Sequence, residues 1–85
     1  MSGERSAWRA NDVVANDALR EQANTAIALL LRLANDGAIV ADQAVCAATD
    51  IRAELSAVDG YDRAAVDTAR ARLDERITEL TDKQP

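Results

Sequence analysis

Residues 25–40, with the sequence TAIALLLRLANDGAIV, form the most apolar stretch of the chain and decide the fold. The unbroken apolar run covers only Ala26 to Leu31, because Arg32 interrupts it and the Asn-Asp-Gly sequence that follows ends it. A helix that crosses a bilayer needs about 20 apolar residues. The stretch therefore does not predict a membrane span, and its spacing has to decide between a strand and a helix.

The apolar side chains of this region recur with the period of an α-helix. On a helical wheel centred on Leu19, one arc holds Ala23, Ala26, Ile27, Leu30, Leu33 and Ala34. Leu29 and Leu31 flank that arc on opposite sides and widen it to roughly 200°. One neighbouring helix cannot cover so wide a face. The sequence therefore predicts a helix covered from two directions, by two neighbours or by one neighbour and a second subunit.

We expect this first helix over about residues 12–36, with a start at Asp12 or Asn16, since Asp and Asn are good N-caps. Gly37 suits the left-handed residue that follows a last helical turn. A second helix is expected over about 40–59, with Asp42 or a residue nearer Val40 at its start. Its single apolar stripe consists of Val40, Ala44, Ala47, Ala48, Ile51, Leu55 and Val58.

A third helix is expected over about 62–81, with Asp62 as its N-cap. Its stripe consists of Val66, Ala69, Leu73, Ile77 and Leu80. Charged side chains at helical spacing predict four ion pairs on its outer side, each worth a few tenths of a kcal/mol. These pairs are Arg63–Asp67, Arg70–Asp74, Arg76–Glu79 and Glu79–Lys83.

No segment alternates apolar and polar residues as a strand does, so the fold class is all-α. Short connections force antiparallel neighbours, which predicts an up-down-up three-helix bundle or a three-helix protomer of a helical oligomer. Residues 1–11 are expected to be a flexible arm, and residues 12–82 a single helical domain. The core is thin, with eighteen Leu, Ile and Val residues and no Phe, and a thin core favours association with another chain.

Composition and charge exclude several classes of function. The net charge of −5 argues against nucleic acid as a partner, because affinity for phosphates comes from Lys and Arg. The chain has no His, and no candidate nucleophile lies beside an evident base, so we expect no enzyme, no cofactor, no metal and no small-molecule substrate. One cysteine and no apolar leader predict a reducing, cytoplasmic location. The abundance of Ala and Arg suggests a bacterial or phage origin.

Six residues are candidates for contact with a protein partner. Trp8 lies between Arg5 and Arg9, and Trp and Arg are enriched among interface hot spots. Leu29 and Leu31 flank the wide arc of the first helix. Cys46, Ala53 and Ala57 form a second face of the second helix, whose small side chains permit close approach of another helix.

The segment 53–73, AELSAVDGYDRAAVDTARARL, places Gly60 at a turn, Ser56 four residues before it, and Val66 and Ala69 where a following helix packs back. It resembles a helix-turn-helix of the phage-repressor type. The resemblance covers about a quarter of the chain and implies that Arg63, Ala64, Asp67 and Thr68 face the major groove of DNA. Three features depart from that pattern. Asp59 occupies a normally apolar position, the preceding helix is too long, and the reading face carries an acid.

The sequence therefore predicts a small acidic, non-enzymatic helical module that binds another protein or self-associates through its helix faces. One alternative is a phage-type inhibitor, anti-CRISPR-like or directed at other host machinery, that blocks a basic surface. A second alternative is a helix-turn-helix DNA-binding regulator.

Overall fold

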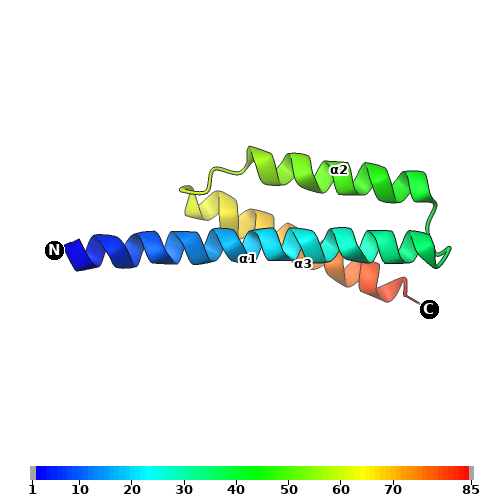
Figure 1. Cartoon of the computed structure of the whole chain (residues 1–85), viewed down its shortest axis with the longest axis horizontal. Coiled ribbons are helices and arrows are strands. Elements are labelled where there is room, and N and C mark those ends of the chain that lie inside the picture. The colour runs from blue at the N-terminus through cyan, green and yellow to red at the C-terminus, as the bar shows by residue number, and fades with distance from the viewer. Residues whose placement is uncertain (1, 85) are drawn as a thin grey trace.

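The chain folds into three helices joined by two short connections, as the computed structural model in Figure 1 shows. The structure describes the backbone of residues 2–84 and the side chains of residues 14–84. The helices are α1 (Ser2–Asn35), α2 (Ala41–Ala57) and α3 (Arg63–Asp82). They run up, down and up, and no strand occurs among the described residues. The predicted all-α, three-helix bundle is confirmed.

The start of α1 was placed too late by the sequence pattern. The helix begins at Ser2, before either predicted start at Asp12 or Asn16. After Gly3, no Gly or Pro interrupts the chain until Gly37, so neither polar residue needs to act as a cap. In Figure 1, α1 continues past the ends of α2 and α3. The role of residues 1–11 as an arm stays a prediction, because their side chains lie outside the described residues.

The end of α1 follows the predicted glycine stop. Gly37 has φ = 78°, a left-handed conformation that costs a residue with a Cβ free energy. The Gly37 amide donates to the Ala34 carbonyl at 3.2 Å, and the Ala38 amide donates to the Leu33 carbonyl at 2.9 Å. These two bonds make a Schellman motif, which satisfies carbonyls that the helix leaves unpaired and reverses the chain toward α2.

The second helix begins and ends one or two residues inside its predicted bounds. Val40 is the N-cap residue with extended backbone, and its side chain makes no capping bond. The predicted cap, Asp42, instead lies in the first turn, where a carboxylate interacts favourably with the helix dipole. Val40 was expected on the buried stripe and is exposed, because the residue before the helix does not follow the helical period. Val58 is the C-cap.

The third helix starts as predicted. The Asp62 carboxylate accepts a hydrogen bond from the Ala65 amide at 3.1 Å, which is the bond that defines an N-cap. Of the four predicted ion pairs, only Arg63–Asp67 forms, at 3.3 Å.

Two of the other side chains expected in ion pairs on α3 face α1. The Arg70 Nε donates to Gln22 Oε1 at 3.1 Å, and the Gln22 amide donates to the carboxylate of Asp74. Gln22 therefore bridges two α3 residues that were expected to pair with each other.

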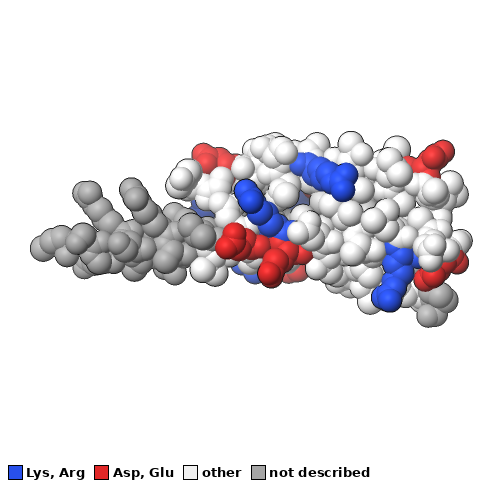
Figure 2. Space-filling model, in the orientation of Figure 1, with Lys and Arg blue, Asp and Glu red and all other residues white. Residues whose placement is uncertain are grey.

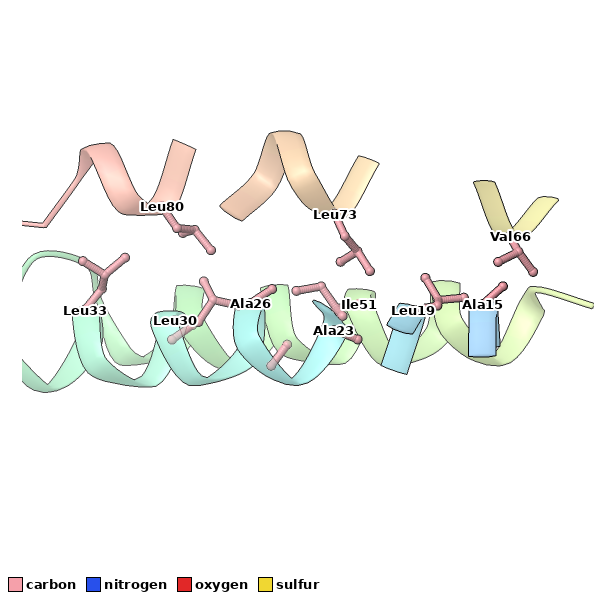
Figure 3. Close-up of a cluster of buried hydrophobic side chains, with 12 residues drawn as sticks. Ala15, Leu19, Ala23, Ala26, Leu30, Leu33, Ile51, Val66, Leu73 and Leu80 are labelled. Carbon is pink, nitrogen blue, oxygen red and sulfur yellow. The ribbon is translucent and has the colours of Figure 1, made fainter. Parts of the chain in front are cut away.

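The core lies along α1, where side chains of α2 and α3 meet it from two directions. α1 packs against both of the other helices, so the predicted cover from two directions is confirmed. The Leu31 flank of the arc was expected to be covered as well, but Leu31 is 56% exposed, because neither neighbour reaches that side of α1. In Figure 3, Val66, Leu73 and Leu80 of α3 point toward α1, and Ile51 joins them from α2. Among residues 14–84, the buried residues are Ala15, Leu19, Ala23, Ala26, Leu30, Leu33, Ala44, Ala48, Ile51, Val66, Leu73 and Leu80.

The second and third helices make only minor contact with each other. In Figure 1, α3 crosses behind α1 and moves away from α2 toward its own C-terminus. The wide apolar arc of α1 is the physical reason, because a helix seated on each flank of a broad arc is separated from the helix on the other flank. The bundle is therefore open along one side.

Candidate interaction surface

A groove runs along this open side, and we call it the α2–α3 groove. It contains two hollows of about 430 and 440 Å³. The open-end hollow, near the C-terminus of α3, is lined by Leu30, Ile39, Gln43, Cys46, Ala47, Asp50, Arg76, Leu80 and Lys83. The loop-end hollow is lined by Glu54, Ala57, Val58, Asp62, Ala64, Ala65, Thr68, Ala69 and Arg72. Leu30 of α1 lies at the base of the open-end hollow, between the two walls.

The walls of the groove carry charges of opposite sign. The charged residues that α2 contributes to the two hollows are Asp50 and Glu54, both acidic. Those that α3 contributes are Arg72 and Arg76, both basic. The residues that cap α3 add one charge of each sign, Lys83 at the open end and Asp62 at the loop end. On the face shown in Figure 2, by contrast, basic and acidic side chains stand beside one another and no large patch of one sign forms.

One ion pair crosses the groove between the hollows. The Arg76 guanidinium lies 3.6 Å from the Glu54 carboxylate, and both side chains are partly exposed. An exposed pair at this distance contributes about 0–1 kcal/mol, so it does not hold the walls together. Among residues 14–84, no other ion pair links α2 to α3.

Small side chains leave room between the two walls. Ala47 and Cys46 line the open-end hollow, and Ala57, Ala65 and Ala69 line the loop-end hollow. Alanine side chains project little from the helix backbone, so another helix can approach closely at these positions. The groove therefore has small side chains on both walls, and its base is partly apolar.

Two residues of the predicted small face line this groove, one in each hollow. Cys46 is exposed and lines the open-end hollow, and Ala57 is exposed and lines the loop-end hollow. Ala53 is exposed one helical turn before Ala57 but lines neither hollow. The helical period places these residues on one face, and Cys46 and Ala57 of that face border the open side.

The other predicted interaction residues lie away from the groove or have side chains outside the described residues. Leu29 is partly buried against the core, so much of its side chain is already covered within the protomer. Leu31 is 56% exposed and lines neither hollow. Trp8 lies on the N-terminal part of α1, and its side chain is outside the described residues.

The structure also bears on the features associated with the other function classes. Within the described residues, no group of three or more Cys, Asp or Glu side chains is arranged to hold a metal ion. None of the described helices is both long enough and apolar enough to cross a membrane. The segment that resembles a helix-turn-helix has its two helices packed on α1 with little contact between them, whereas the helices of that motif pack against each other. The Arg63 side chain of its reading face is engaged with Asp67.

Sequence reasoning missed the charged residues of the groove. Arg76 was expected to pair with Glu79 along α3, and it reaches Glu54 of α2 instead. The local spacing along α3 allowed the expected pair. Only the placement of α2 and α3 on α1 brings Arg76 close to Glu54.

Comparison with known protein families, with curated proteins and with solved structures finds no match to this chain.

Proposed function

We propose that this chain is a small acidic, non-enzymatic helical module that binds another protein chain through the α2–α3 groove. One observation supports the proposal above all others. Each of α2 and α3 packs on α1, but the two make only minor contact with each other. A helical bundle is ordinarily closed by packing of neighbouring helices, so the open side is where a further helix completes the layer.

The groove provides the features that helix-in-groove recognition uses. The base is partly apolar, with Leu30 and Leu80 beneath the open-end hollow. The small side chains of Cys46 and Ala57 admit a close approach. The charged walls fix the direction in which a partner lies, because complementary charges set orientation more than affinity.

The proposal is tested with Cys46, which is exposed and is the only cysteine of the chain. A photo-reactive group attached to this thiol is expected to cross-link to a protein chain, both in the purified protein and in lysate of the cells that express it. Ala57→Arg places a long charged side chain in the loop-end hollow and is expected to abolish the cross-link.

The matched control is Ala71→Arg, which makes the same change on the exposed side of α3 outside both hollows. It should leave the cross-link intact. The proposal is contradicted when labelled Cys46 cross-links to no protein in either sample. It is also contradicted when Ala57→Arg and Ala71→Arg have equal effects while both variants keep the helicity of the parent.

A further inference from the structure

We infer that the occupant of the α2–α3 groove is the same groove of a second copy of this chain. The two copies form a two-fold dimer in which α2 of each lies against α3 of the other. This inference rests on the proposed function and names its partner.

The charges of the groove favour a second copy over a partner of strong net charge. The chain as a whole has a net charge of −5, yet the two hollows are balanced. Their acids are Asp50, Glu54 and Asp62, and their bases are Arg72, Arg76 and Lys83. A neutral surface gives no general attraction to a polyanion or to a basic protein. It fits a partner whose positive and negative charges lie in matching positions.

The arrangement of those charges makes the groove complementary to itself. A two-fold axis parallel to the helices places Asp50 and Glu54 of α2 in one copy over the α3 wall of the other, whose helix residues Arg72 and Arg76 are basic. Glu54 and Arg76 of one protomer lie at the same height along the groove, so each then faces the opposite charge of the partner. A two-fold axis across the groove instead places Glu54 near its own copy. Like charges placed together are unfavourable, which selects the first axis.

The dimensions of the groove reach the minimum size of a specific interface. α2 has 17 residues and is therefore about 26 Å long at 1.5 Å per residue. Two adjacent helices are about 20 Å wide, so the face covers roughly 500 Å² in each copy. The total of about 1,000 Å² reaches the lower limit for a specific interface. Burial of the partly apolar base adds to the stability of a protomer whose own core is thin.

The deciding experiment uses charge reversal and mixing. Sedimentation velocity of the purified protein over a range of concentrations is expected to show a monomer–dimer equilibrium. Glu54→Arg and Arg76→Glu are each expected to raise the dimer Kd by about tenfold or more, because each alone places like charges across both halves of the interface. A mixture of the two variants is expected to recover association, since each copy then supplies the charge that the other lacks.

Controls keep folding separate from association. Glu21→Arg and Arg32→Glu make the same changes of charge on exposed positions of α1 outside the hollows, and both are expected to dimerise like the parent. All four variants should keep the helicity of the parent, because the Glu54–Arg76 pair is partly exposed and contributes little within a protomer.

Two outcomes overturn the inference. A parent protein that stays monomeric at every concentration shows that the groove does not bind a second copy. In that case the proposed function stands only when Cys46 still cross-links to a different protein. A parent that dimerises while the mixed variants fail to recover association shows that the copies meet through another surface.

Discussion

Replacing Ile51 by alanine is expected to weaken the packing of α2 on α1 more than any other single truncation in α2. Three residues of α2 are buried, and two of them are Ala44 and Ala48. Ile51, which is 1% exposed, is therefore the only large side chain that α2 buries completely. Because α2 has little contact with α3, no other helix can compensate for the loss.

The size of the effect follows from the atoms removed. Ile51→Ala deletes three buried carbons, worth about 2.4 kcal/mol at about 0.8 kcal/mol per methylene. Incomplete collapse of the cavity raises the cost to about 3–4 kcal/mol, within the range of about 2–5 kcal/mol for such changes. An 85-residue domain has a free energy of unfolding of about 4–13 kcal/mol. The substitution therefore removes a large share of the total stability.

Denaturant unfolding followed by far-ultraviolet circular dichroism measures this cost. All proteins are compared at one concentration, because association of the folded state shifts the apparent stability. Val45→Ala is the matched control, since Val45 lies on the same helix and is 60% exposed. It is expected to change the free energy of unfolding by less than about 0.5 kcal/mol. Equal costs for Ile51→Ala and Val45→Ala would refute the placement of α2 on α1.

Three further outcomes are expected from single substitutions. Gly37→Ala should lower the free energy of unfolding by about 1–2 kcal/mol, because φ = 78° is unfavourable for a residue with a Cβ. Gly37→Asn should lower it by less. Equal stability of Gly37→Ala and the parent would contradict a left-handed backbone at this position. Asp62→Ala should cost about 0.5–2 kcal/mol through loss of the bond to the Ala65 amide, and Asp62→Asn should recover most of it in the same unfolding assay. Leu30→Asp should abolish cooperative unfolding, because it buries an unpaired carboxylate. Leu31→Asp, on the exposed side of α1, should change the free energy of unfolding by about 0.5 kcal/mol or less. Loss of helicity in both variants would show that Leu31 is not exposed.

The local signals in the sequence were sufficient to predict the three helices and the positions of two helix ends. Gly37 and Asp62 act within one helical turn of their own positions, so their neighbours in sequence decide what they do. The stripe of α3 was also predictable, since Val66, Leu73 and Leu80 repeat at the helical period and are all buried. The start of α1 was not predictable in the same way, because polar residues that can cap a helix can also lie within one.

The candidate site was only partly within reach of the sequence. The helical period placed Cys46 and Ala57 on one face of α2, and that face lines the groove. The pairing of Arg76 with Glu54 was out of reach, because these residues lie on different helices and their distance depends on how each helix seats on α1. A charged side chain on a helix has several possible partners one turn away on the same helix. Tertiary packing decides whether it contacts one of these or a residue of another helix.

The sequence by itself determined that this protein is three amphipathic helices, and that the first must be covered from two directions. Those properties follow from the period of the apolar side chains and from residues that stop or cap a helix locally. Only the tertiary structure decided that α2 and α3 stand apart and that the groove between them has one acidic and one basic wall. The physical reason is the broad apolar arc of α1. It seats the two helices on separate flanks, and their orientation on those flanks sorts charges that are interspersed along the chain.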